Sequence, residues 1–170
     1  NQLGKNKLAC IYLHEGQNTA LIYNYKGELI DKLDFPKGKK LNQFYEEEDV
    51  PLTTFSLSSF YHPDLLYQIS LDNLEIKAVE ALYVPYDVKK SETRYVTYAS
   101  KDGTKVPMYI TCNKDLKLNG DNPVLIYAYG GYGTVVEPFY DQSTALFLAH
   151  GGVLAVPNVR GGGVKGSDWT

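Results

Sequence analysis

Short runs of alternating apolar and polar residues dominate the first half of the chain and predict β-strands. Turn residues separate these runs, and no 3.6-residue apolar repeat of a helix interrupts them before about Val79. The expected strands cover residues 7–13, 19–25, 28–35, 53–60 and 64–69. Lys26-Gly27 is typical of a tight hairpin turn between the second and third of them. A strand meander at this spacing is typical of β-propeller blades, although one or two blades could not bury their faces alone.

The second half of the chain opens on a pattern that predicts another hairpin. Two strand-like runs, at 94–99 and 106–111, flank the turn Lys101-Asp102-Gly103-Thr104. The Asp-Gly pair supplies the positive φ that hairpin turns need.

Continuous rather than alternating apolar runs follow, at 124–129 and 153–156. Runs of this kind predict strands that are covered on both faces, as in a parallel sheet. Residues 140–150 between them predict a crossover helix that ends at Gly151-Gly152. The second half is therefore expected to be α/β. Residues 84–93, rich in Pro, Lys and Ser, predict the linker between the two halves.

Composition excludes several broad classes of protein and partner. Hydrophobic residues at 44% and charged residues at 22% are near globular averages, which argues against disorder, collagen and coiled coil. A net charge of −3 argues against a nucleic-acid or an acidic-membrane partner. No run of about 18 apolar residues predicts a membrane span, and the first residues lack the apolar stretch of a signal peptide. The start resembles an internal cut, so both a cytoplasmic and a periplasmic location stay open.

Nothing in the sequence predicts a metal ion or another cofactor. Cys10 and Cys112 are far apart and lack C-x-x-C spacing, so free thiols are expected rather than a disulfide or a zinc site. The acidic run 46–49 lacks the interleaved glycine of a calcium loop, so a solvated loop is expected there.

Two glycine loops follow the two continuous apolar runs and carry the candidate chemistry. The first is Tyr129-Gly130-Gly131-Tyr132, and the second is Arg160-Gly161-Gly162-Gly163. Loops at the carboxyl ends of parallel strands face the crevice where ligands bind. The diglycine predicts a sharp reversal with little bulk, so the rings of Tyr129 and Tyr132 would project into that crevice. The alternative is that both rings only cap the sheet edge.

The second loop supports two further interpretations. Arg160 is expected to hold its loop through bidentate hydrogen bonds to a carboxylate. Residues 161–166 also satisfy G-x-G-x-x-G after a strand, which would indicate a dinucleotide site. This match is weak because the strand is not the first of the α/β half, and the expected acidic partner would fall beyond Thr170.

Three motifs in order give the chain a resemblance to the prolyl oligopeptidase family of serine peptidases. They are Ser-Lys-Asp-Gly-Thr-Lys-Val-Pro-Met at 100–108, Tyr-Ala-Tyr-Gly-Gly-Tyr at 127–132 and the glycine-rich run at 151–163. Upstream, Ser-Ser-Phe-Tyr-His-Pro at 58–63 resembles closing propeller strands of that family. The resemblance implies C-terminal strands of a β-propeller over 1–83, the linker over 84–93 and the N-terminal part of an α/β-hydrolase catalytic domain over 94–170.

The resemblance also implies an activity, which is cleavage of peptides after proline by a Ser-Asp-His triad. In such enzymes the tyrosine before the diglycine donates its hydroxyl to the oxyanion, and Tyr129 holds that position. The aromatic residue after the diglycine belongs to the substrate-proline pocket, where Tyr132 replaces the usual phenylalanine. Val164 departs from the glutamate that usually follows the triple glycine, which puts local ion pairing in doubt.

The triad itself is not expected within these residues. His14 and His62 lie in the propeller-like half and His150 ends a helix, whereas the family's histidine comes near the far C-terminus. No G-x-S-x-G elbow occurs. The segment alone is therefore expected to be inactive. Its expected partners are a peptide substrate, the remainder of its own hydrolase domain and, at micromolar concentration, further copies of itself.

Two alternatives remain open. The parent protein could be a non-catalytic peptide-binding protein that retains the hydrolase scaffold. Val164 is the only feature of the sequence that favours this alternative. The parent protein could also be an acyl-peptide hydrolase or a dipeptidyl peptidase, although these relatives usually lack this combination of glycine motifs.

Overall fold

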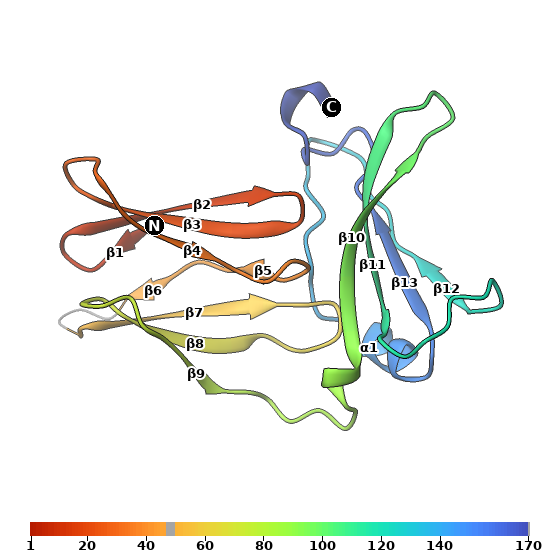
Figure 1. The fold of residues 1–170 in the computed structure, drawn as a ribbon, viewed down its shortest axis with the longest axis horizontal. Helices are drawn as coiled ribbons and strands as arrows, with labels where there is room; N and C mark the ends of the chain where they lie inside the picture. Colours follow the sequence, from red (N-terminus) through yellow and green to blue (C-terminus); the bar gives the residue numbers. More distant parts are fainter. Residues whose placement is uncertain (47–49, 170) are drawn as a thin grey trace.

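The computed structural model describes residues 1–46 and 50–169, and the strands of these residues form three sheets (Figure 1). The first sheet has the antiparallel order β1-β2-β3-β4. Its strands are β1 (Gln2–Leu3), β2 (Lys7–His14), β3 (Gln17–Asn24) and β4 (Leu29–Asp34). The strands expected at 7–13, 19–25 and 28–35 are thus present to within two residues, whereas β1 was missed.

The second sheet has the antiparallel order β5-β7-β8-β9, with β6 also paired to β7. Its strands are β5 (Lys40–Leu41), β6 (Tyr45–Glu46), β7 (Leu52–Ser58), β8 (Leu65–Ser70) and β9 (Ile76–Glu80). The sequence predicted β7 and β8 and missed the other three. Residues 47–49 of the expected acidic loop lie outside the described residues.

The third sheet has the order β10-β11-β13-β12 and mixes two kinds of pairing. Its strands are β10 (Ser91–Ala99), β11 (Lys105–Asn113), β12 (Val124–Ile126) and β13 (Val153–Pro157). The expected hairpin is β10–β11, and Gly103 in its turn has φ +82°. The strands β12 and β13 run parallel, as their continuous apolar sequences predicted. Two short 3-10 helices, η1 (Val88–Lys90) and η2 (Gly166–Trp169), lie before β10 and after the glycine loops.

Helix α1 (Gln142–Ala149) is the expected crossover between β12 and β13. It begins after Asp141, whose carboxylate accepts a hydrogen bond from the Thr144 backbone N–H at 2.7 Å. It ends at Ala149 with His150 as its C-cap, and Gly151 follows with φ +88°, the left-handed conformation that terminates many helices. The sequence therefore encodes both ends of this helix locally.

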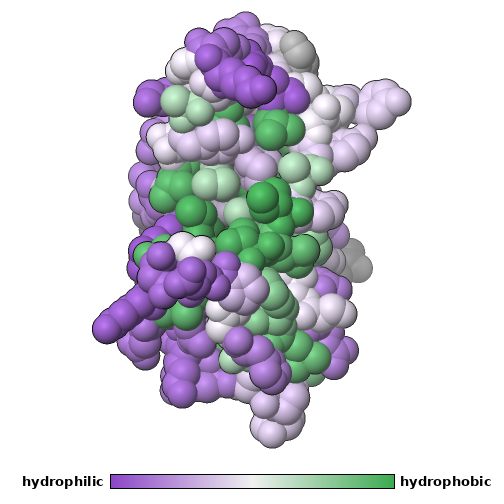
Figure 2. Space-filling view, turned by 90° about the vertical axis from the view of Figure 1, so that its right-hand side faces the viewer, coloured by the Kyte–Doolittle hydropathy of each residue, from purple (hydrophilic) through white to green (hydrophobic). Residues whose placement is uncertain are grey.

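The two parallel strands differ in burial, and this corrects one expectation. All five residues of β13 are buried, but Val124, Leu125 and Ile126 of β12 are 55%, 43% and 67% exposed. The expectation that both runs are covered on both faces is thus right for β13 and wrong for β12. The reason is position, because β12 lies at the sheet edge and pairs with β13 alone among the described strands. Figure 2 faces this side of the molecule and shows hydrophobic residues gathered across it.

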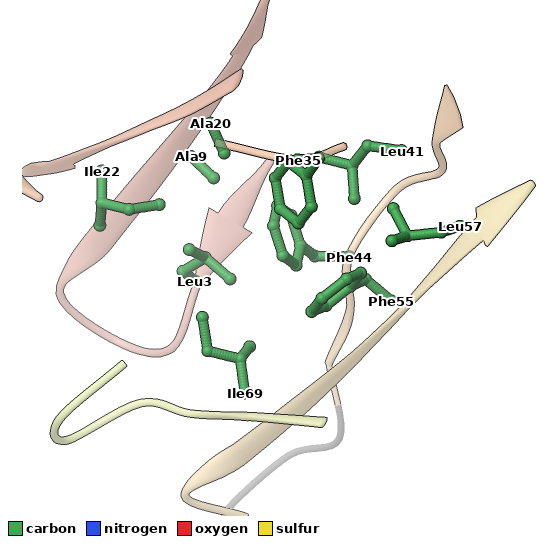
Figure 3. Packing of buried hydrophobic residues seen from close by; sticks show 10 residues of the cluster. All are labelled: Leu3, Ala9, Ala20, Ile22, Phe35, Leu41, Phe44, Phe55, Leu57 and Ile69. Atoms are coloured by element: carbon green, nitrogen blue, oxygen red, sulfur yellow. The ribbon is translucent and has the colours of Figure 1, made fainter. Parts of the chain in front are cut away.

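The first two sheets share one apolar core. Residues of alternating positions on the first sheet meet aromatic rings from the second sheet and its connections (Figure 3). Phe55 lies at the centre, with its ring centroid 5.3–5.5 Å from the rings of Phe35, Phe44 and Tyr67. The two sheets therefore form one packed unit, here called the N-terminal part (residues 1–46 and 50–83).

The C-terminal part (residues 91–169) packs against turns at one end of the N-terminal part. The turns at Gly16 and Gly38 approach β10 so closely that an added Cβ would lie 2.6 Å from the Tyr95 ring and 2.5 Å from Thr93. Phe60, in the β7–β8 connection, is buried among residues of the C-terminal part. The strand β10 begins at Ser91, within the stretch expected to be a linker.

Candidate active site

The two glycine loops lie side by side at the carboxyl ends of β12 and β13. The Tyr127 N–H donates to the carbonyl of Ala155 at 3.0 Å, which extends the strand pairing beyond β12. The Gly133 N–H then donates to the carbonyl of Gly161 at 3.0 Å. These backbone hydrogen bonds fix the two loops to each other, as expected for loops after neighbouring parallel strands.

Gly130 and Gly161 are required because the backbones of the two loops approach each other closely, not because the chain reverses there. A Cβ added to Gly161 would lie 2.4 Å from the carbonyl oxygen of Gly130, and one added to Gly130 would lie 2.5 Å from the carbonyl oxygen of Arg160. Real Cβ atoms do not approach oxygen so closely. The reversal itself occurs at Tyr132 and Gly133, which have φ values of +55° and +66°. The expectation that the diglycine makes the bend is therefore corrected.

Tyr129 lies beside a hollow at the junction of the two parts. The hollow has a volume of about 260 Å³, and its lining includes Tyr129, Tyr127 and Phe139 from the C-terminal part and Lys40 from β5. The Tyr129 side chain is 43% exposed, and its hydroxyl oxygen lies 3.3 Å from the position of a Cβ on Gly131. The phenol therefore lies over its own loop and remains accessible, rather than packed inside the protein.

Tyr132, the second aromatic residue of the motif, projects into solvent, and its place in a substrate-proline pocket stays a prediction. Its side chain is 99% exposed, and it does not line the hollow beside Tyr129. Its backbone has positive φ, which is uncommon for a residue with a side chain. Within the described residues, the structure brings Tyr129 to a hollow and leaves Tyr132 in solvent.

One ion pair crosses the junction beside Tyr129. The Lys40 ammonium lies 3.7 Å from the carboxylate of Glu137, and both side chains also line the hollow. Both are partly exposed, with side-chain exposures of 39% and 24%, so the pair contributes little to stability by itself. Sequence reasoning missed both residues because neither belongs to a motif and they are far apart along the chain.

Arg160 supports its loop through the tip of the β10–β11 hairpin. One guanidinium nitrogen donates to the carboxylate of Asp102 and lies 3.5 Å from the Thr104 hydroxyl, and another lies 3.5 Å from the Ser100 hydroxyl. Instead of the expected bidentate hydrogen bonds to one carboxylate, Arg160 thus contacts three side chains. The hydrogen bond from Arg160, followed by that from the Thr104 backbone, lowers the pKa of Asp102 to about 2.

We expect the Arg160→Gln variant to raise the pKa of Asp102 from about 2 towards its ordinary value of 3.8. In the wild type, this carboxylate stabilises the folded state above pH 4, and that contribution is lost as the pH falls towards 2. NMR titration of the side-chain carboxyl resonances measures the shift. Asp141, whose pKa is lowered by hydrogen bonds from Thr144, is the internal control and should titrate unchanged. An Asp102 pKa that stays near 2 in the variant contradicts this account.

Gly163 packs against the backbone of the first loop, and Lys165 holds the residues after it. A Cβ on Gly163 would lie 2.2 Å from the carbonyl oxygen of Gly133, so the triple glycine packs along the first loop. After Val164, the next residue, Lys165, donates to the Lys105 carbonyl at 2.6 Å, and its ammonium lies over the Trp169 ring, 4.2 Å from the ring centroid.

Two of the three histidines make local contacts with backbone carbonyls, and the third lies on a strand of the N-terminal part. His62 is buried and its Nδ1 lies 2.6 Å from the carbonyl of Pro63, and the Nδ1 of His150 lies 2.8 Å from the carbonyl of Leu146. His14 is on β2 in the N-terminal part. Among residues 1–46 and 50–169, no group of three or more His, Cys, Asp or Glu side chains converges on a possible metal position.

The cysteines and the helices of the described residues can be compared with the sequence-based expectations of free thiols and of no membrane span. Cys10 is half-buried and Cys112 is buried, and both are free thiols. Within the described part of the chain, no helix is both long and apolar enough to cross a membrane.

No protein-family model matches the chain, but individual proteins do. It is 29% identical over 158 residues to the prolyl endopeptidase of Elizabethkingia miricola, which is 93% of this chain. It is 32% identical over 173 residues to prolyl oligopeptidase A of Amanita bisporigera, which is 97% of this chain. A solved prolyl endopeptidase superposes over 99% of this chain with a TM-score of 0.86 and 32% identity.

The chain belongs to the prolyl oligopeptidase family. Prolyl oligopeptidase B of Galerina marginata, solved with a 35-residue hydrolysis and macrocyclisation substrate, also superposes over 99% of this chain with a TM-score of 0.86 and 27% identity. The chain spans 22% of the length of the two curated relatives and 25% and 24% of the two solved chains. This prolyl oligopeptidase-family chain is mostly β in structure, and its coverage shows that it corresponds to a limited region of its relatives.

Proposed function

We propose that this chain is a segment of a serine peptidase that cleaves peptides after proline and that Tyr129 supplies a hydroxyl to its oxyanion hole. The observation that carries the proposal is the position of Tyr129. Its accessible phenol lines a hollow between the N-terminal and C-terminal parts, directly before the diglycine of the family motif. Two solved relatives are complexes with 35- and 25-residue substrates, which supports a peptide as the substrate of the complete protein.

The two packing units support the proposed division of the chain. Residues 1–83 form C-terminal strands of a β-propeller, residues 84–93 the linker, and residues 94–170 the start of an α/β-hydrolase catalytic domain. The shared core around Phe55 supports the first assignment, since adjacent blades of a propeller pack face to face. The parallel pair β12–β13 with its crossover helix supports the last one.

Tyr129 has a defined role in the proposed reaction. A serine hydroxyl gives its proton to the catalytic base while its oxygen attacks the carbonyl carbon of the proline residue, and the carbonyl electron pair moves onto oxygen to form an oxyanion. The Tyr129 hydroxyl donates a hydrogen bond to that oxyanion and keeps its own proton. When the intermediate collapses, the peptide C–N bond breaks, the amine leaves with a proton from the catalytic base, and the acyl group stays on serine.

Other polypeptide is required to complete the proposed site. The uncovered face of β12 borders an apolar hollow of about 300 Å³, lined by Leu125, Ile126, Tyr127 and Phe139 among others. An exposed apolar face beside an unpaired strand edge is suited to be covered by further strands and helices. We propose that the rest of the hydrolase domain, which carries the serine, aspartate and histidine, packs there. Copies of the isolated segment would associate through the same face.

An assay of the complete polypeptide that contains this segment tests the proposal. We expect cleavage of a chromogenic peptide with proline before the cut, little cleavage of the matching alanine peptide, and covalent labelling of one serine by a fluorophosphonate. The segment alone should do neither. Equal cleavage after alanine would favour the acyl-peptide hydrolase or dipeptidyl peptidase alternative. Peptide binding without cleavage or labelling would favour a non-catalytic binding protein, which is the alternative that Val164 favours.

A further inference from the structure

Phe60 belongs to the N-terminal part by sequence but to the core of the C-terminal part by packing. It lies in the connection between β7 and β8 and is 1% exposed. The apolar cluster around it comes from the C-terminal part and comprises Tyr109, Val136, Leu148, Leu154 and Val156. One aromatic ring therefore passes from the first packing unit into the second.

The connection that carries Phe60 is held in shape by hydrogen bonds. The Ser59 hydroxyl accepts from the His62 backbone N–H at 3.0 Å and donates to the His62 carbonyl at 3.1 Å. The Ser58 hydroxyl donates to Asp64 at 2.6 Å, which closes the base of the same turn. Ser59 and His62 are both buried. The turn thus fixes the direction in which the Phe60 ring projects, rather than leaving it to the flexibility of a loop.

A row of rings leads from Phe60 to the loop of Tyr129. The Phe60 ring lies 5.9 Å from the Phe139 ring at an interplanar angle of 69°, and the Phe139 ring lies 5.4 Å from the Tyr127 ring at 70°. Both contacts are edge-to-face, the geometry that aromatic pairs prefer. Tyr127 and Phe139 line the hollow beside Tyr129, and Tyr127 precedes Tyr129 by two residues.

We propose that Phe60 is a positioning residue for Tyr129, and that it acts through Phe139 and Tyr127. Phe60 is the buried ring of this row, and its edge contacts the Phe139 ring directly. Removing the Phe60 ring lets the Phe139 and Tyr127 rings shift, and the shift moves the phenol of Tyr129 relative to the oxyanion. Displacements of about 1 Å at a catalytic group cost up to about 100-fold in rate. Catalytic geometry therefore depends on the N-terminal part being docked on the C-terminal part.

The kinetic test uses the complete polypeptide and rests on the proposed peptidase function. We expect Phe60→Leu to lower kcat by about 10-fold with little change in KM. Phe55→Leu is the matched control, because Phe55 is equally buried but its ring contacts lie in the N-terminal core. It should leave kcat near the wild-type value. In a Tyr129→Phe background, Phe60→Leu should cause no further loss, because the group that it positions is already gone.

Two kinetic results would overturn the positioning role. One is a loss of equal size in the wild-type and Tyr129→Phe backgrounds, which would show that Phe60 acts independently of the phenol. The other is an equal loss with Phe55→Leu, which would show general destabilisation. If Tyr129→Phe leaves turnover unchanged, the oxyanion-hole role fails instead, and the kinetics separate the two failures.

Hydrogen exchange tests the positioning without relying on activity. The Gly133 N–H donates to Gly161, and the Thr134 N–H donates to Gly131, so both amides report the closed state of the loop. We expect Phe60→Leu to speed exchange at these two amides about 10-fold, whereas Phe55→Leu leaves them unchanged. Unaltered exchange in the Phe60→Leu protein would overturn the inference.

Discussion

Replacing Tyr129 by Phe in the complete polypeptide should lower kcat about 100- to 1000-fold, the usual cost of losing one oxyanion-hole donor. The substitution keeps the ring and removes only the hydroxyl, so the packing around Tyr127 and Phe139 is retained. Because the hydrogen bond forms with the oxyanion and not with the substrate carbonyl in its ground state, KM should change little. Steady-state kinetics on a prolyl peptide measure both constants.

Tyr25→Phe is the matched control for this variant. Tyr25 is also a partly exposed tyrosine, but it lies in the β3–β4 turn of the N-terminal part, so its hydroxyl is remote from the glycine loops. It should leave kcat unchanged. A Tyr129→Phe enzyme that retains full turnover would refute the role of the phenol. A protein that binds the peptide with unchanged affinity in both variants and never cleaves it would be a binding protein on a hydrolase scaffold.

Local sequence was sufficient to predict the elements that are determined locally. The strands β2, β3 and β7 follow from alternation, the hairpin turn from Asp102-Gly103, and the limits of α1 from Asp141 and Gly151. Each of these features is decided by residues within one or two turns of chain. The short strands β1, β5 and β6 were missed because two residues carry no periodicity, and their pairing partners fix them.

The candidate site depends on contacts that no local pattern encodes. The resemblance indicated Tyr129, but Lys40 and Phe60 reach its surroundings from the N-terminal part across long stretches of sequence. The exposure of β12 also could not be predicted, because a continuous apolar run does not reveal whether its cover lies within the same segment. The role of the diglycine was misassigned for a similar reason, since the atoms that forbid a Cβ belong to a loop 30 residues away.

That distant contact leads to an expected loss of stability and of activity in the Gly161→Ala variant. Gly161 has φ +88°, and a Cβ there would lie 2.4 Å from the carbonyl oxygen of Gly130. The two loops must separate to admit the methyl group, which breaks the hydrogen bond from the Gly133 N–H to the Gly161 carbonyl. We expect kcat to fall at least 10-fold, because Gly130 directly follows Tyr129 and the phenol moves with it.

Gly151→Ala separates the effect of the close approach from that of the backbone conformation. Gly151 has the same φ of +88°, but nothing lies within 4 Å of a Cβ placed there. Both variants therefore bear the cost of a left-handed alanine, and only Gly161→Ala adds the steric conflict. We expect the free energy of unfolding to fall about 1–3 kcal/mol further in Gly161→Ala than in Gly151→Ala, as for other overpacked sites. Urea denaturation of the two variants measures this difference. Equal losses would mean that the loops do not require glycine for their contact, and that the triple glycine serves the turn alone.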